Sequence, residues 1–386
     1  MSSVDDILPN GWKETTLGEV AFFQRGFDLP KKDREKGDYP LMVSNGQDET
    51  HKEFKVKAPG IVTGRSGSLG NVFYVDKDFW PLNTTLWIKE FYSNNVKFIY
   101  YLLKIFPFER YNSGSGVPTL NRNHIHPLSI KIPSNIQEQK AIANVLTAFD
   151  DKIENLRAQN QTLEQTAQTI FKEWFGKYQI GDELPDGWSV GEINDLVEFV
   201  IDNRGKTPPL VDESIDSHPL IEVNSITGDD RNINLSVGKK FVDEKTYQNW
   251  FRKGHPINGD ILLSTVGSIG QLAQVFDEKI TVAQNIVALR SNTSGNFLYE
   301  LLKRNQKLII NLDISSVQPS IKVPHLLSMP VVIPVLDLIQ QFDKVVDKLT
   351  IKITSNNKQI QTLTQTRDAL LPKLMRGEIR VNGFKK

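Results

Sequence analysis

Apolar residues recur at alternating steps of four and three along two stretches of the chain, residues 134–176 and 335–378. Spacing of this kind, sustained over about five heptads, is typical of the seam of a coiled coil. We therefore predict two long helices, each about 60 Å long at 1.5 Å per residue. The seam positions are Ile142, Leu146, Phe149, Ile153, Leu156, Asn160, Leu163, Ala167, Ile170 and Trp174 in the first helix, and Phe342, Val346, Leu349, Ile353, Asn356, Ile360, Leu363, Arg367, Leu370 and Leu374 in the second.

The ends of both predicted helices carry recognisable signals. A capping-box pattern precedes each apolar series, and a glycine follows it as a stop. The capping boxes are Ser134-x-x-Gln137 and Asp337-x-x-Gln340, and the glycines are Gly176 and Gly377.

Each seam contains one asparagine, Asn160 in the first helix and Asn356 in the second. A buried amide without a partner costs ~1–3 kcal/mol, whereas two facing asparagines satisfy each other. We therefore predict an antiparallel pair with Asn160 opposite Asn356, a register that also places Leu163 opposite Ile353. Such a pair would hold a globular part at each end of a stiff spacer, related by a pseudo-two-fold axis.

The chain also repeats itself. Eight short motifs recur in the same order, with an offset of 176–179 residues that later becomes 200–201. This order indicates a tandem duplication, and the change of offset places an insertion in the second copy between Asn224 and Gly267. The matches include Leu8-Pro-Asn-Gly-Trp12 with Leu184-Pro-Asp-Gly-Trp188, Gly67-Ser-Leu-Gly70 with Gly267-Ser-Ile-Gly270, Pro118 with Pro319, and Gln161-Thr-Leu-Glu-Gln-Thr166 with Gln361-Thr-Leu-Thr-Gln-Thr366.

Short β-rich runs alternate with Gly, Pro and Asn in the part of each copy that precedes the long helix. These runs read as strands at 70–75, 84–88, 260–265 and 286–289, with helices at 96–106 and 297–310. The predicted class is mixed α/β (α+β). The predicted domains are a first globular part at 1–133, a first helix at 134–176, a second globular part at 182–334 and a second helix at 335–378.

Composition narrows the class of protein. The 386 residues hold no cysteine, and 46 Lys and Arg balance 46 Asp and Glu. Residues 182–334 are acidic, with 14 Lys and Arg against 20 Asp and Glu. A neutral charge argues against a protein that binds nucleic acid unaided. With no signal-peptide pattern and no apolar run of membrane-spanning length, we expect a cytoplasmic protein without membrane contact.

Catalytic and metal-binding motifs are weak. Gly205-Lys206-Thr207 ends like a phosphate-binding loop, but Val200 stands where that loop needs glycine. His124-x-His126 has no third ligand nearby in the sequence, and no nucleophile, histidine and acid form a set. We therefore predict neither a catalytic site nor a metal site.

The combined pattern resembles the specificity subunits of type I restriction–modification systems. The resemblance rests on Leu-Pro-x-Gly-Trp opening each half, Gly-Ser-Leu/Ile-Gly within each globular part, and a proline followed by a Gln-rich heptad helix. It implies that each globular part is a target-recognition domain reading one half of a bipartite double-stranded DNA target. The helices would set the gap and dock two modification subunits, which hold S-adenosylmethionine and methylate adenine at N6. A restriction subunit would join to translocate and cut, and this chain itself would be non-catalytic and carry no cofactor.

Candidate DNA contacts are polar residues on breaker-rich loops at matched places in both copies. Arginine binds guanine in a bidentate manner and asparagine binds adenine, although such residues also serve as turn or phosphate contacts. The insertion around 226–250 is a further candidate for specificity. The candidates are Arg25, Asn45, Arg65, Ser66, Ser68 and Asn83 in the first copy, and Asn203, Arg204, Lys206, Asn224, Ser268 and Asn285 in the second.

Two alternatives stay open at the level of sequence. The repeated Gln-Thr phrase is either a docking face for a partner protein or a solvated helix face. The whole chain, in turn, is compatible with a non-DNA adaptor that carries two ligand-binding modules on a coiled-coil scaffold.

Overall fold

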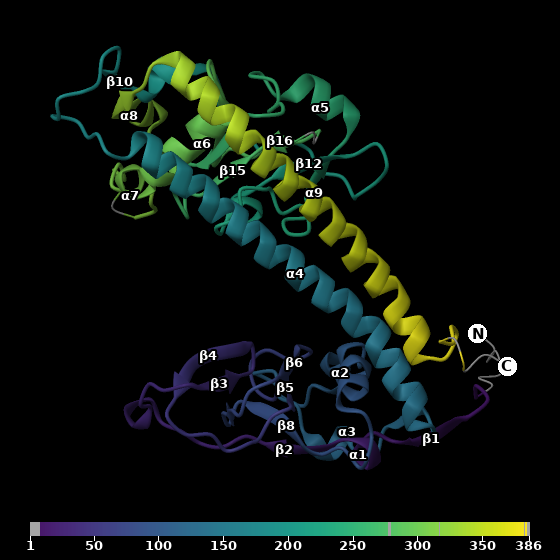
Figure 1. Ribbon diagram of the computed structural model, residues 1–386. Coiled ribbons are helices and arrows are strands. Elements are labelled where there is room, and N and C mark those ends of the chain that lie inside the picture. The colour runs from purple at the N-terminus through teal and green to yellow at the C-terminus, as the bar shows by residue number, and fades with distance from the viewer. Residues whose placement is uncertain (1–7, 277–278, 316, 382, 384–386) are drawn as a thin grey trace. The chain divides into compact units, whose positions relative to one another are not determined.

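The computed structural model describes residues 8–276, 279–315, 317–381 and 383, and it divides into two compact units. Unit 1 comprises residues 1–154 and 361–386, and unit 2 comprises residues 155–360. The sequence assigned the long helices to segments of their own, whereas each helix contributes one segment to each unit (Figure 1). The reason is packing, because the seam of each segment joins the apolar core of the neighbouring globular part.

The two predicted long helices are α4 (Ile136–Phe175) and α9 (Leu336–Met375). Their starts differ from the predicted capping boxes. The Asn135 side chain accepts from the Gln137 backbone N–H at 2.8 Å, while the Ser134 backbone N–H donates to the Gly11 carbonyl. Asn135 therefore caps α4, one residue later than the predicted cap, because its side chain reaches the free N–H groups of the first turn.

The start of α9 also differs from the sequence pattern, but here the helix begins earlier than the predicted cap at Asp337. The Val335 carbonyl accepts from the backbone N–H groups of Leu338 and Ile339. Asp337 lies inside the first turn. Its carboxylate suits the positive end of the helix dipole there without acting as the cap.

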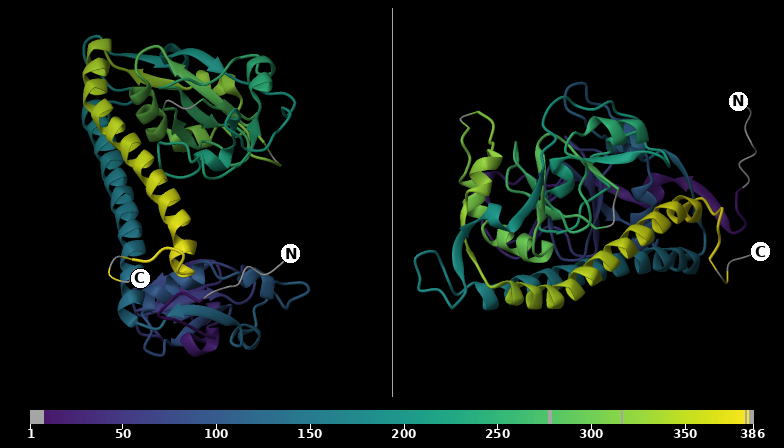
Figure 2. Two further views of the ribbon diagram at one scale, coloured as in Figure 1. Left: turned by 90° about the vertical axis from the view of Figure 1, so that its right-hand side faces the viewer. Right: turned by 90° about the horizontal axis from the view of Figure 1, so that it is seen from above.

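Within each unit the two helix segments run antiparallel, and Figure 2 shows them side by side from two further directions. In unit 2, the Asn356 Nδ2 donates to the Asn160 Oδ1 at 2.8 Å, and the Asn160 Nδ2 donates to the Asn357 Oδ1 at 2.7 Å. In unit 1, Arg367 pairs with Asp150 at 2.6 Å. The residue numbers of these pairs have a nearly constant sum, as in the register that the heptads predict.

The described residues of unit 1 form three small sheets, antiparallel except where β3 meets β7. Its helical elements are α1 (Leu17–Val20), η1 (Lys31–Asp33), α2 (Val96–Lys104), η2 (Phe108–Tyr111) and α3 (Arg122–Ile125). The sheets are β1 (Trp12–Thr16) with β9 (Ser129–Pro133); β2 (Phe22–Arg25), β8 (Thr85–Glu90), β5 (Gly60–Gly64) and β6 (Val72–Val75); and β4 (Gly46–His51), β3 (Tyr39–Val43) and β7 (Trp80–Pro81).

Unit 2 repeats this topology. Its sheets are β10 (Ser189–Glu192) with β18 (Pro330–Ile333); β11 (Val197–Ile201), β17 (Ile286–Ser291), β14 (Ile261–Ser264) and β15 (Leu272–Gln274); and β13 (Phe241–Val242), β12 (His218–Ile221) and β16 (Thr281–Val282). The helical elements are η3 (Ile193–Leu196), η4 (Val223–Ile226), α5 (Glu244–Trp250), α6 (Gly295–Arg304), α7 (Gln306–Ile310) and α8 (Val323–Leu327). The helix predicted at 297–310 is thus broken at Asn305 into α6 and α7.

The repeated motifs make the same hydrogen bonds in both units. The Gly67 N–H donates to the Pro118 carbonyl at 2.9 Å, and the Gly267 N–H donates to the Pro319 carbonyl at 2.9 Å. Both glycines have a left-handed backbone, with φ of +93° and +83°, which side-chain-bearing residues rarely adopt. The repeated glycines and prolines therefore preserve one turn, and the duplication extends to the fold.

The insertion of the second copy falls in two places. β4 and β13 occupy the same position in their sheets, next to β3 and β12 respectively. The longer connection before β13 contains η4 and residue Arg231, and the connection after β13 contains α5. Among the described residues, none of the helices combines the length and apolar character needed to cross a bilayer.

Candidate nucleic-acid interface

Three of the six candidates in unit 1 gather around one carboxylate, that of Asp28. Arg25 ends β2 and forms an ion pair with Asp28 at 3.5 Å, and the side-chain amide of Asn83 also donates to Asp28. The Nε of Arg65, just after β5, donates to the backbone carbonyl of Asn83 at 2.9 Å. Strand ends that are far apart in the sequence thus present two guanidinium groups together. Sequence reasoning missed Asp28, although it follows Arg25 by only three residues.

The charge of this cluster favours an anion. Arg25 keeps 53% of its side chain exposed. Burial, followed by repulsion from Arg25, lowers the pKa of the Arg65 guanidinium from its ordinary value, while Asp28 opposes the shift. Two cations facing one carboxylate leave a net positive charge. Such a site suits a phosphate oxygen or the guanine edge.

The other unit 1 candidates lie on adjoining loops. Ser66 forms a bridge with Thr119 and donates its backbone N–H to the Thr84 carbonyl at 3.1 Å. Ser68 and Asn45 are both exposed. A Cβ added at Gly64 would meet carbonyl oxygens from residues 44 and 68, so the turn holding Asn45 and the loop holding Ser68 meet there.

Asn203, a candidate in unit 2, uses its side chain inside the protein. Its Nδ2 donates to the Gly254 carbonyl at 3.1 Å, and its Oδ1 accepts from the Lys253 N–H at 3.2 Å. Asn203 therefore joins the loop after β11 to the loop after α5. Both the nitrogen and the oxygen of its side-chain amide are already hydrogen-bonded, so Asn203 holds the two loops together.

This junction brings basic residues together that the sequence did not single out. Arg252 and Lys253 are exposed on the loop after α5, and Trp250 is 40% exposed beside them. On the other loop Lys206 is exposed, while the Arg204 Nε is bound by Asp202 at 2.9 and 3.0 Å. The consecutive residues 250–253 combine two aromatic rings with two cations, a combination that suits nucleic acid and was present in the sequence.

Asn224, Ser268 and Asn285 are the remaining candidates in unit 2. Asn224 is exposed within η4, and the Ser268 carbonyl accepts from the Ser264 hydroxyl at 2.6 Å. The Asn285 carbonyl accepts from the backbone N–H of the residue after β14 at 2.9 Å, as the Thr84 carbonyl does from the residue after β5 at 2.8 Å. Asn285 is therefore the counterpart of Thr84.

The same pairing shows how the copies differ at the surface. The residue after β5 is Arg65, and the residue after β14 is Thr265. Both donate a backbone N–H to the loop before the next strand, at 2.8 and 2.9 Å. One backbone turn thus holds a partly exposed arginine in unit 1 and a fully buried threonine in unit 2. Different side chains on one scaffold are what two different recognition surfaces require.

The repeated Gln-Thr phrase lies on the outer faces of α4 and α9. The hydroxyl of Thr162 donates to the Ala158 carbonyl at 3.1 Å, and the hydroxyls of Thr166 and Thr366 donate to carbonyls one turn back at 2.8 Å. These threonines thus engage their own helix. The glutamines of both phrases are exposed and offer amide groups on each helix.

The weak catalytic and metal motifs have structural roles. The His126 Nε2 accepts from the Phe23 backbone N–H at 3.0 Å, and burial lowers the pKa of His126. Residues 203–210, which contain Gly205-Lys206-Thr207, are irregular and do not begin a helix. Within the described part of the chain, no three His, Cys, Asp or Glu side chains are grouped as metal ligands would be.

Comparison with known proteins decides the family. The model of the type I restriction modification DNA specificity domain matches twice, at residues 9–165 and 185–365. The chain belongs to this family. The two matches coincide with the two halves of the internal repeat, so the family's domain occurs here in tandem, and the protein is a type I DNA specificity protein.

Individual relatives of this chain support the same family assignment. The MjaIX specificity subunit of Methanocaldococcus jannaschii is 28% identical over 305 residues, which cover 74% of this chain and 69% of the relative. The HindI specificity subunit of Haemophilus influenzae is 24% identical over 95% of this chain and 99% of its own length. The crystal structure of the S subunit from M. genitalium shares the fold, with a TM-score of 0.63 and 20% identity over 97% of this chain and 98% of that one.

Proposed function

We propose that each globular part of this specificity protein reads one half of a bipartite DNA target, and that the antiparallel helices set the gap between the halves. The observation that carries the proposal is the pair Arg65 and Thr265 on one hydrogen-bonded turn, which offers a partly exposed guanidinium in unit 1 and only a buried hydroxyl in unit 2. A duplicated scaffold with unlike surface chemistry suits two unlike half-sites. Two half-sites on the same face of the DNA are separated by one helical turn (~34 Å) or by a multiple of that distance.

Within this proposal the Asp28 cluster is the first DNA contact to test. Arg25 and Arg65 are held by neighbouring loops, and Asn83 is oriented by the same carboxylate. Asn45, Ser66 and Ser68 border them. In unit 2 the corresponding contacts are Arg204, Lys206, Asn224, Ser268 and Asn285, with Asn203 in a supporting role.

The proposed partners are two modification subunits and a restriction subunit, with S-adenosylmethionine bound by the modification subunits and the reaction carried out there. This chain would then be non-catalytic and act in the cytoplasm. The exposed glutamines repeated on α4 and α9 support docking of two like partners, because each helix presents the same amide groups. The net charge of zero supports a shared DNA interface, since phosphate contacts supply much of the affinity of DNA-binding proteins.

The test is to map N6-methyladenine in a host that expresses the modification subunits with this chain or with Arg65→Ala. We expect a bipartite motif for the native chain, and loss of selectivity at one position of one half for the variant, by about 1–3 kcal/mol. Arg376→Ala is the matched control, because Arg376 is 68% exposed beside Glu378 at the end of α9. An undivided motif in the native complex would contradict the proposal, and an unchanged motif in the variant would remove Arg65 from the interface.

A further inference from the structure

Arg231 lies in the second-copy insertion, in the connection between η4 and β13, and its side chain is completely buried. Arginine is almost never fully buried unless it is paired. The sequence suggested that this insertion carries exposed reading residues. Arg231 instead places its side chain in the interior of unit 2.

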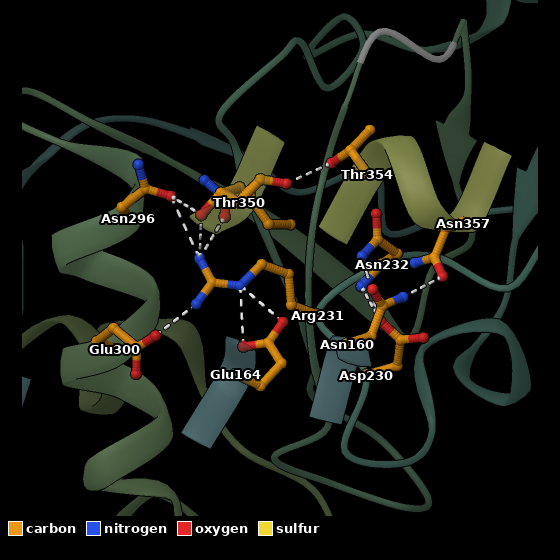
Figure 3. A network of polar contacts seen from close by, with 11 residues as sticks. Asn160, Glu164, Asp230, Arg231, Asn232, Asn296, Glu300, Thr350, Thr354 and Asn357 are labelled. Atoms are coloured by element: carbon orange, nitrogen blue, oxygen red, sulfur yellow. Dashed lines mark hydrogen bonds and ion pairs between the residues drawn. The ribbon is translucent and has the colours of Figure 1, made fainter. Parts of the chain in front are cut away.

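The guanidinium binds both long helices (Figure 3). Its Nε donates to the two carboxylate oxygens of Glu164 on α4, at 3.0 and 3.2 Å, and its Nη1 donates to the Thr350 hydroxyl on α9 at 3.2 Å. Glu164 and Thr350 are themselves buried, at 7% and 3% exposure. One side chain from the globular part therefore ties it to α4 and α9 at once.

The same guanidinium also binds the globular part. Nη2 donates to Glu300 on α6, and Nη1 lies 3.2 Å from both the Asn296 Oδ1 and the Gln274 Oε1. The Tyr299 ring lies 4.3 Å from the guanidinium carbon. Every side of the cation is thus occupied by an acceptor or an aromatic face, which a planar, multidentate guanidinium satisfies and an ammonium does not.

Charge makes the cluster sensitive to the loss of its centre. Burial lowers the pKa of Arg231, but the carboxylates of Glu164 and Glu300 outweigh burial and raise it above the ordinary value. Burial raises the pKa of Glu300 to about 7. The cation is therefore permanent, and removing it would leave two buried carboxyl groups facing each other.

Unit 1 makes the equivalent attachment in another way. The side-chain caps Asn95 and Ser294 start α2 and α6 in the same way, and Tyr101 and Glu300 lie at the same distance after these caps, so Tyr101 is the counterpart of Glu300. On the long helices, the repeat offset of 200 residues makes Asp150 the counterpart of Thr350. There the Tyr101 hydroxyl donates to Asp150 at 2.6 Å, and Arg367 of α9 binds the same carboxylate at 2.6 Å. In unit 1 the arginine belongs to a helix, whereas in unit 2 it belongs to the globular part.

We propose that Arg231 is a positioning residue, which fixes the orientation of the second globular part on α4 and α9 and so sets where the second half-site is read. The inference rests on the proposed bipartite function. It concerns how sharply the gap is measured. The globular part cannot rotate on the helices without breaking the bonds from Arg231 to Glu164 and Thr350.

The experiment maps N6-methyladenine in a host expressing the modification subunits with native chain, Arg231→Lys or Arg231→Met. For native chain we expect one gap length. For Arg231→Met we expect the methylated fraction at that gap to fall severalfold and sites with gaps one base pair longer or shorter to rise severalfold, with an unchanged sequence in each half. Arg231→Lys keeps the charge but loses the multidentate contacts, so it should give an intermediate spread.

The matched control is Arg290→Met. Arg290 binds Asp260 through two hydrogen bonds, at 3.0 and 2.9 Å, within the sheet of the same globular part. If Arg231→Met lowers the melting temperature as Arg290→Met does but leaves the gap sharp, the role of Arg231 is structural and the inference is overturned. A native motif without two halves would instead refute the proposed function.

A charge-balanced variant keeps the test decisive if Arg231→Met does not fold. Arg231→Met combined with Glu164→Met and Glu300→Met replaces the cation and both carboxylates with apolar side chains of similar volume, a change that buried ion clusters often tolerate. A broadened gap in this variant supports positioning by the cluster. A sharp gap in this variant, or in Arg231→Lys if only that variant folds, overturns it.

Discussion

The seam asparagines provide a prediction in which two substitutions remove the same hydrogen bond with unequal effect. Asn160 is 7% exposed and Asn356 is 0% exposed. The Asn160 amide has two partners, because its Oδ1 accepts from Asn356 and its Nδ2 donates to Asn357. The Asn356 Oδ1 is buried without a hydrogen-bond partner among the described residues. We compare Asn160→Leu, Asn356→Leu and the double variant.

The expected magnitudes follow from what each change leaves behind. Asn160→Leu leaves the Asn356 amide with neither group satisfied in a fully buried position. Asn356→Leu leaves only the Asn160 Oδ1 without a donor and also removes an oxygen that had no partner. At ~1–3 kcal/mol for each unsatisfied buried group, Asn160→Leu should be less stable than Asn356→Leu by about 2 kcal/mol or more. The double variant leaves neither amide in the seam. It should be more stable than the sum of the single changes by two unsatisfied groups, or about 2–6 kcal/mol.

The assay is native-state hydrogen exchange, read from peptides covering residues 155–175. A local probe is needed because a chain with two compact units is not expected to unfold in one step. About 2 kcal/mol corresponds to a roughly 30-fold difference in exchange rate if exchange follows local opening. Gln159→Leu is the control and should change exchange little, because Gln159 is an exposed neighbour whose amide donates to Asn155 at 2.6 Å.

Two results would refute this reasoning. Equal losses in the single variants would mean that the unpaired Asn356 oxygen has no energetic weight. Additive losses in the double variant would mean that Asn160 and Asn356 are not coupled.

Three further predictions concern other groups. The raised pKa of Glu300 means that the folded state binds a proton more tightly than the unfolded chain, so stability should fall as pH rises from about 4.5 to about 7, and Glu300→Gln should flatten that dependence in thermal melts. Arg380→Met removes the cation that binds Glu138, which is only 2% exposed, and should destabilise unit 1 by about 3–5 kcal/mol in urea unfolding, whereas Arg380→Lys should lose less. Gly64→Ala places a methyl group against backbone carbonyl oxygens and should abolish DNA binding by the assembled complex, while Gly116→Ala, with nothing within 4 Å, should bind normally.

The sequence by itself determined the features that depend on the spacing of residues that are close together in the chain. The seam of α4 and α9 could be read because side chains three and four residues apart share one face of a helix. Their register could be read because Asn160 and Asn356 are the single amides of the two predicted seams, and an amide in a seam needs a partner. The duplication was visible because a tight turn such as that at Gly67 tolerates few residue types.

Tertiary structure decided what depends on residues far apart in the chain. No local pattern distinguishes Arg231 from an exposed loop arginine, because its burial depends on carboxylates 67 and 69 residues away. The gathering of Arg25, Arg65 and Asn83 around Asp28 likewise required strands to pair. The periodicity of a sequence indicates which side of a helix or strand faces the interior. The strength of a polar contact depends instead on its partner and on the exclusion of water, and both arise only when the chain folds.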